Sequence, residues 1–253
     1  NDVVRLVRGI KGRVKMRSEL VLRFDYGSVV PWVRRLDGGI VAVGGPDAVA
    51  LHSVVLTHGE DYTTVAEFEV AEGAEVPFVM TYFPSHREMP LPIDGHAACE
   101  ATTLAWRTWV GRSNYDGAFK PQVHRSLLTL KALTYAPSGG IVAAPTTSLP
   151  EQLGGVRNWD YRYVWLRDAA LTLSALMGHG FAAEAAEWRG WLLRAIAGDP
   201  GDVQIMYGLG GERRLPEWEP ASLPGYRGAA PVRVGNAAYL QFQGDVFGEV
   251  MLA

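Results

Sequence analysis

The chain has 253 residues, of which 48% are apolar and 20% charged, and its formal net charge is −3. This composition is typical of a globular protein that forms one large domain or two smaller ones. The slight acid excess and the lack of a basic stripe exclude a nucleic-acid partner. No apolar run approaches the ~18 residues that span a bilayer, so we expect no membrane partner. The six histidines lack metal-ligand spacing, so we expect no metal ion and no cofactor.

Residues 1–95 carry the pattern of short β-strands. Alternating or continuous apolar runs are separated by Gly, Pro and Asp, which is typical of antiparallel sheets. We therefore predict an antiparallel β-sandwich domain over residues 1–95. Its expected strands cover residues 3–8, 13–16, 20–26, 39–43, 50–56, 63–70 and 76–82.

From residue 97 the apolar residues recur with helical spacing. We predict a linker region over residues 96–120 and a helical domain over 121–253. Two long connections, 139–157 and 200–232, are of a length that is uncommon unless the loop is functional. The expected helices cover residues 97–110, 124–135, 168–177, 181–197 and from about residue 236 to the end.

The last expected helix has no terminating Gly, Pro or basic turn before Ala253. We therefore expect a fragment cut at its carboxyl end, and the start at Asn1 rather than Met leaves the amino end open. Such a fragment would leave the apolar faces of 124–135 and 168–177 uncovered. We expect it to aggregate, or to be poorly ordered after about residue 120.

Residues 158–168 hold the densest group of aromatic and charged side chains. The segment has two Trp, two Tyr, two Arg and two Asp, more charge than a core tolerates without pairing. Flat aromatic faces among bidentate hydrogen-bonding groups suit sugars, whose C–H faces stack and whose hydroxyls need paired donors and acceptors. Asp168 is also placed to cap the helix that follows, and this alternative stays open. The candidate sugar-binding residues are Trp159, Tyr161, Trp165, Arg167 and Asp168.

The run GG-x-RNWDYRY-x-WLRDA, residues 154–169, resembles glycoside hydrolase family 15, the glucoamylase-like enzymes, and especially its bacterial glucoamylase and trehalase branch. The resemblance implies an α+β multidomain chain: an N-terminal antiparallel β-sandwich, a linker helix and the first part of an (α/α)6 barrel, over residues 121–253. Nearly the whole chain is similar. The further matching segments are residues 23–27, 31–33, 125–135, 143–151, 204–208 and 231–238, with 211–217.

Enzymes of this family invert the anomeric centre, with one glutamic acid that protonates the leaving oxygen and one glutamate that activates water. The resemblance implies that Trp165, Arg167 and Asp168 hold the non-reducing glucose while Tyr161 packs against it. No catalytic residue is assigned within the chain, because neither carboxylate has a counterpart here. We expect both beyond Ala253.

The loop Glu217-Trp218-Glu219 superficially resembles a Trp-Glu acid site. Its place before Arg233 does not match the place of the family's acid, so we interpret it as a pocket rim. Arg233 and Asn236 lead into an expected helix start and are candidates for substrate contacts in an outer subsite. A capping role for Asn236 stays open.

The predicted function is a glycoside hydrolase that cleaves α-glucosidic bonds with inversion and releases glucose from trehalose, a small-molecule carbohydrate substrate. The alternatives are a glucoamylase-type glucan 1,4-α-glucosidase, a non-catalytic carbohydrate-binding piece, and a phosphorylase, which would need an anion site. The sequence leaves the oligomeric state open. Cys99 is the one cysteine, so we expect it to be buried in a protein of a reducing compartment, the cytoplasm.

Overall fold

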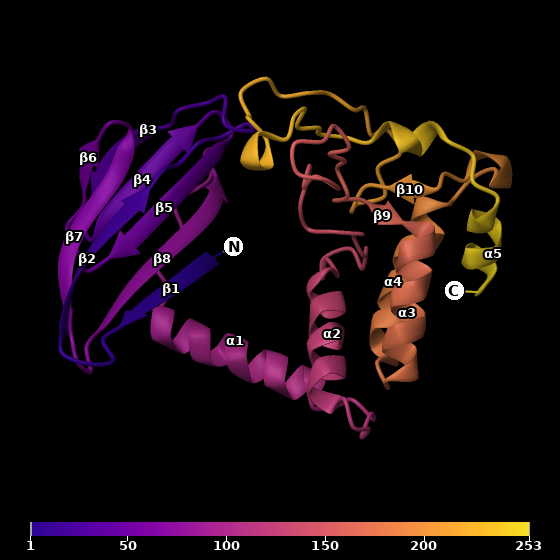
Figure 1. The fold of residues 1–253 in the computed structure, drawn as a ribbon, viewed down its shortest axis with the longest axis horizontal. Coiled ribbons are helices and arrows are strands. Elements are labelled where there is room, and N and C mark those ends of the chain that lie inside the picture. Colours follow the sequence, from indigo (N-terminus) through magenta and orange to yellow (C-terminus); the bar gives the residue numbers. More distant parts are fainter. Residues whose placement is uncertain (1, 253) are drawn as a thin grey trace. The chain divides into compact units, whose positions relative to one another are not determined.

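The chain forms two compact units, and the boundary between them falls between Ala105 and Trp106. The structure is a computed structural model that describes residues 2–252 (Figure 1). Each unit has its own core, and each is described below by itself.

The first unit consists of two antiparallel sheets, as expected from the strand pattern (Figure 1). A five-stranded sheet has the order β1-β8-β5-β4-β3, and a three-stranded sheet has the order β2-β7-β6. Phe68 and Phe78, one from each sheet, have ring centroids 5.6 Å apart, so the two sheets contact each other through side chains. The strands are β1 (Asp2–Arg8), β2 (Arg13–Leu20), β3 (Trp32–Leu36), β4 (Gly39–Gly44), β5 (Asp47–Ser53), β6 (His58–Glu60), β7 (Thr63–Ala71) and β8 (Glu75–Pro84).

The strands form where apolar side chains alternate. In β8, Val79 and Phe83 are buried while Tyr82 is exposed, because successive residues of a strand point to opposite faces. Strands β4 and β5 form a tight hairpin in which Gly44 pairs with Asp47. Gly45 supplies the positive φ of +61° that this turn requires.

Two details of the predicted strands are wrong, and so is the prediction that Cys99 is buried. Residues 20–26 are not a strand, because β2 ends at Leu20 and the bridge between Phe24 and Val29 closes a turn instead. Strands β3 and β6 were not expected. Strand β3 contains two adjacent arginines and so lacks an apolar alternation, and β6 has only three residues, too few to show one. Cys99 is only partly buried, on the helix that follows.

The second unit is helical, with long loops between the helices. Helix α3 contacts α2, α4 and α5, and the short strands β9 and β10 pair beside its first turn (Figure 1). No helix within residues 2–252 is long and apolar enough to cross a membrane. The elements are α1 (Gly95–Val110), which spans the boundary, α2 (Lys120–Ala132), β9 (Val164–Trp165), α3 (Leu166–Gly178), α4 (Ala182–Ala195), β10 (Met206–Tyr207) and α5 (Asp245–Leu252), with 3₁₀ turns at Pro200–Asp202, Tyr226–Gly228 and Ala237–Leu240.

The core of the second unit gathers around α3 and α4. Trp188 and Trp191 of α4 are fully buried against Leu173 of α3 and Tyr207 of β10. Trp191 also donates from its indole to the carbonyl of Leu209 at 2.9 Å, so its polar atom is satisfied inside the core. Loop residues such as Ile205 and Leu215 pack against the same core.

Two helix boundaries differ from the prediction. The helix expected from residue 236 to the end is a 3₁₀ turn and the separate helix α5, because Gln241 adopts an extended backbone (φ −80°, ψ 149°). Helix α3 begins at Leu166, with Trp165 at its N-cap position. Asp168 therefore lies inside the first turn, where a carboxylate suits the helix dipole, and the capping alternative for Asp168 is wrong.

Candidate functional site

A hollow of about 360 Å³ lies in the second unit, beside the start of α3. The segment that precedes α3 supplies three aromatic rings to it, and two loops later in the chain supply the rest. Four of the seven predicted binding residues are brought together here: Trp159, Tyr161, Trp165 and Asn236. The complete lining is Trp159, Tyr161, Trp165, Glu217, Asn236, Ala237, Ala238 and Gln241.

The three rings reach one hollow because the backbone before α3 is extended. The amides of Ser148 and Ala144 donate to the carbonyls of Trp159 (2.8 Å) and Tyr161 (3.0 Å), which holds this segment along a neighbouring loop. In extended backbone successive side chains point to opposite sides. Trp159, Tyr161 and Trp165 accordingly share the side of the hollow, while Asp160 and Val164, at the alternate positions, are buried.

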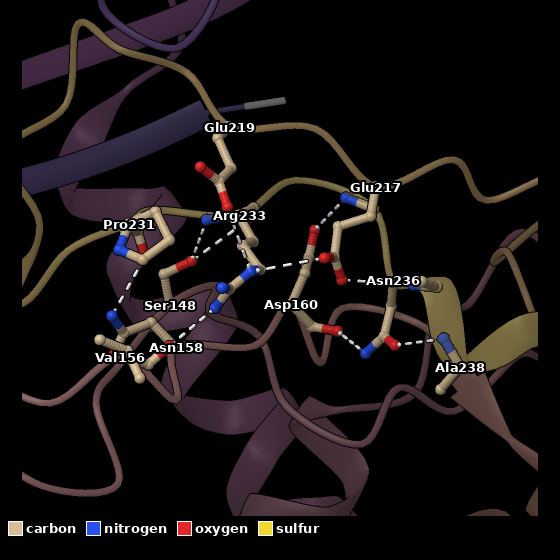
Figure 2. Close-up of polar contacts among 12 residues, drawn as sticks. Ser148, Val156, Asn158, Asp160, Glu217, Glu219, Pro231, Arg233, Asn236 and Ala238 are labelled. Carbon is tan, nitrogen blue, oxygen red and sulfur yellow. Dashed lines mark hydrogen bonds and ion pairs between the residues drawn. The ribbon is translucent and has the colours of Figure 1, made fainter.

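Asp160 is the polar centre of the buried side. Its carboxylate accepts hydrogen bonds from the Arg162 backbone (3.1 Å) and from Nε (2.9 Å) and Nη2 (2.7 Å) of the Arg162 guanidinium. It also accepts one from the amide of Gly235 at 3.1 Å, while its backbone carbonyl accepts one from the Asn236 amide group at 2.9 Å (Figure 2). Sequence reasoning missed this role, although the alternation of aromatic and polar residues across 158–165 contains the signal.

Arg233 lies against the Trp159 ring and does not line the hollow. Its guanidinium carbon is 4.6 Å from the centroid of the Trp159 ring, a cation–π contact. Nε is 3.4 Å from Glu217 Oε1 and 3.6 Å from Glu219 Oε1, and Nη1 donates to the carbonyl of Val156 at 2.8 Å (Figure 2). These contacts with the protein hold the guanidinium of Arg233 against the Trp159 ring, so Arg233 supports Trp159.

Arg167 and Asp168 are not among the residues that line the hollow. They form a pair of 3.4 Å between Nη2 and Oδ2, and both side chains are 42% exposed. Arg167 Nη1 lies 3.3 Å from Asp245 Oδ2 at the start of α5, and its guanidinium is 5.9 Å from the Trp165 ring. The pair therefore adjoins the lining through Trp165.

Asn236 combines a structural role with its place in the lining. Its Oδ1 accepts from the amide of Ala238 at 3.0 Å and its Nδ2 donates to Asp160, so the side chain caps the 3₁₀ turn Ala237–Leu240 (Figure 2). The capping alternative for Asn236 is confirmed. These bonds use one of the two donors and one of the two acceptor lone pairs of the amide, and Asn236 is only 5% exposed, so little of the side chain is open to a ligand.

The hollow offers several polar groups beside its aromatic rings. Burial, together with the negative charges of Glu151 and Asp168, raises the pKa of Tyr161, so its hydroxyl stays protonated at neutral pH and can donate. Trp165 Nε1 is buried and has no hydrogen-bond partner among residues 2–252. Glu217, which we interpreted as a rim, supplies a carboxylate to the lining, and Oε2 accepts from the amide of Ala237 at 3.3 Å. Aromatic faces, donors and one acceptor carboxylate are the groups that bind a sugar ring.

Comparison with known proteins identifies the class to which this fold and site belong. The model of the family described as glycosyl hydrolases family 15 matches residues 117–253, more than half of the chain and all of the candidate site. The chain belongs to this family, and the resemblance stated from its motifs is confirmed.

Several curated relatives carry the name trehalase. The chain is 35% identical to a trehalase of Mycobacterium tuberculosis over 98% of its own length and 38% of that relative. It is 31% identical to a trehalase of Thermoplasma acidophilum over 100% of its length and 43% of that relative. A trehalase of Mycolicibacterium smegmatis is 44% identical over 59% of the chain and 23% of the relative. The chain thus spans about two fifths of the length of the first and second of these relatives.

Proposed function

We propose that the protein to which this chain belongs is a glycoside hydrolase that releases glucose from trehalose, and that the hollow beside α3 holds a glucose ring. The observation that carries this proposal is the convergence of Trp159, Tyr161 and Trp165 with Glu217 in one hollow, in a chain of family 15. Indole and phenol faces stack on the C–H surface of a pyranose, and the Tyr161 hydroxyl and Glu217 carboxylate reach its hydroxyls.

Trehalose is favoured over an α-1,4-glucan by the names of the relatives, which are trehalases of Mycobacterium tuberculosis, Mycolicibacterium smegmatis and Thermoplasma acidophilum. A glucoamylase-type activity is the second candidate, because it needs the same ring-binding wall. Glucose release from maltotriose with none from trehalose, measured on the full-length protein, would replace the first candidate by the second.

The reaction needs two carboxyl groups, ~6.5–9.5 Å apart in an inverting enzyme, with the water between them. One carboxylate, Glu217, lines the hollow within the described part of the chain, and it already faces Arg233. We therefore place the acid and base outside these 253 residues. We also infer that α2 to α5 belong to the first part of an (α/α)6 barrel. The two sheets of the first unit, in the same proposal, form a sandwich. On its own the chain would bind a glucoside without hydrolysing it. Its cytoplasmic location remains a proposal that rests on the single cysteine.

The binding proposal is tested by calorimetric titration of the chain with trehalose. We expect saturable binding that Trp165→Ala weakens by about tenfold or more, because the variant loses both the apolar contact area and the stacking of the indole on the sugar ring, together worth more than ~1.4 kcal/mol. Trp32→Ala is the matched control, since Trp32 is a 79% exposed indole of the first unit. Equal weakening by both variants, or no binding by the wild-type chain, would contradict the proposal.

A further inference from the structure

Asp160 is fully buried, and its two carboxylate oxygens are saturated by protein donors. Three hydrogen bonds come from Arg162 and one comes from the amide of Gly235. A buried carboxylate is stable only when it is paired and hydrogen-bonded in this way. Because no exposed oxygen remains, Asp160 cannot touch a substrate, and any effect on binding must act through other residues.

The residues next to Asp160 in the chain form the aromatic wall. Trp159 and Tyr161 flank it, and both rings line the hollow. In an extended backbone the side chains before and after a residue point to the face opposite its own. A residue whose side chain is held in place therefore restricts the positions of both neighbouring side chains. The anchored carboxylate therefore sets where the two rings stand.

The loop 231–236 contacts Asp160 and the residues around it. Asn158 Nδ2 donates to the carbonyl of Pro231 at 3.1 Å, and the Arg233 amide donates to Ser148 Oγ at 2.7 Å (Figure 2). Gly235 and Asn236 bind the carboxylate and the backbone carbonyl of Asp160. Asp160 thus joins the aromatic segment to the loop that carries Asn236 and Ala237, which are also lining residues.

We propose that Asp160 is a positioning residue, whose carboxylate holds Trp159 and Tyr161 against the loop 231–236 and so fixes the wall of the sugar-binding hollow. The identity of the ligand, a sugar, rests on the proposed function, whereas the positions of the Trp159 and Tyr161 rings do not depend on it. Asp160→Asn keeps the shape of the side chain but turns an acceptor into a donor among Arg162 and Gly235 N–H groups. The segment should then shift, since two donors cannot face each other.

The test uses the whole chain labelled with 5-fluorotryptophan and observed by ¹⁹F NMR, at a concentration at which light scattering shows the chain to be monomeric. The chain has eight tryptophans, and the Trp159 resonance is identified by its loss in Trp159→Phe. Glu184→Gln is the matched control, because Glu184 is also a buried carboxylate with cationic partners but does not line the hollow. We expect D160N to shift and broaden the Trp159 resonance without sugar and to weaken trehalose binding by roughly tenfold, because displaced Trp159 and Tyr161 rings lose their stacking contact with the sugar. E184Q should change neither.

Three results would decide against the proposal. The Trp159 resonance of D160N could keep its wild-type position, its trehalose Kd could stay at the wild-type value, or E184Q could change both by as much as D160N. A wild-type chain that does not respond to trehalose would contradict the proposed function, while the resonance without sugar still tests the positioning. If D160N does not fold, the double variant D160N/R162Q removes both charges and is compared in the same way, with the same expected shift.

Discussion

At the scale of single residues, Glu184 shows how the second unit tolerates a buried charge. Its carboxylate lies on α4 and accepts a hydrogen bond of 2.6 Å from the Trp109 indole of α1. Oε1 also lies 3.1 Å from Lys131 Nζ on α2 and 3.6 Å from Arg112 Nη2. One side chain therefore links three helices, and its charge is balanced by cations from the neighbouring segments.

Glu184→Gln should destabilise the chain by about 1.5–3 kcal/mol, because the Trp109 indole loses its charged acceptor and Lys131 loses its counter-charge. Chemical denaturation followed by far-ultraviolet circular dichroism measures the change. Glu187→Gln, on the same helix, is the control, since Glu187 has no ion pair assigned within residues 2–252 and its loss should change stability little. Equal stability of the two variants would show that the cluster contributes nothing.

The same site predicts a dependence on pH. Burial alone would raise the pKa of Glu184, but the hydrogen bonds from Trp109 and Lys131 and the charge of Lys131 outweigh it, so the pKa lies below its ordinary value. A group with a lowered folded-state pKa stabilises the fold above its unfolded pKa of ~4.3, and this contribution is lost as the pH falls through the folded-state value. Wild-type stability should therefore fall more steeply than that of E184Q as the pH drops below about 5. Parallel pH profiles would contradict the assignment.

At the scale of elements, the pairing of two loops positions one side of the hollow. Trp218 and Val234 form a bridge, with hydrogen bonds of 2.8 and 2.9 Å in the two directions. Gly235 follows with a φ of +83°, and a Cβ there would collide with the carbonyl of Pro216. Only glycine fits this position, which lies between Val234 and the lining residue Asn236.

Gly235→Ala should destabilise the chain by about 3 kcal/mol and weaken trehalose binding, because the collision pushes the loop away from Asp160. Gly228→Ala separates backbone strain from this collision, since Gly228 has a φ of +75° with open space around it. G228A should cost only about 1 kcal/mol and leave binding unchanged. Thermal unfolding and titration of both variants measure these effects, and identical behaviour of the two would refute the steric argument.

The sequence predicts the regular elements well and the site only in part. Helices α3 and α4 and strands β7 and β8 follow from apolar periodicity, because their buried faces are continuous along the chain. Periodicity could not reveal that Gln241 interrupts the last helix.

For the site, the aromatic residues were found because they are close in sequence and share one side of extended backbone. The contributions of Asp160 and Glu217 depend on the distant loop 231–236, which local patterns do not describe. The same limit explains Arg167, whose contact with Asp245 draws it toward α5. The sequence therefore predicts the aromatic residues of the hollow, while the other lining residues depend on tertiary contacts.

At the scale of the whole molecule, apolar side chains remain exposed on the second unit. They belong to α3, α4, α5 and the turn before α5, and include Leu171 (63% exposed), Leu193 (54%), Phe242 (82%) and Met251 (85%). Relatives with the name trehalase are more than twice as long as the portion that this chain matches. Exposed apolar residues of this size on several helices favour association.

We therefore expect the chain alone to form concentration-dependent oligomers or aggregates. Light scattering after size-exclusion chromatography measures the mass, and Phe242→Ser should lower the oligomeric fraction. Leu56→Ser is the control, because Leu56 is 92% exposed but belongs to the first unit. A monomer at all concentrations that unfolds cooperatively would contradict this expectation.

A crystal structure of the full-length protein with bound trehalose tests the sugar-binding role of the hollow most directly. We expect a glucose ring in the hollow beside α3, with Trp159, Tyr161 and Trp165 around it and the Glu217 carboxylate within hydrogen-bond distance of a sugar hydroxyl. A trehalose molecule bound elsewhere, with this hollow filled by protein side chains or water, would contradict it.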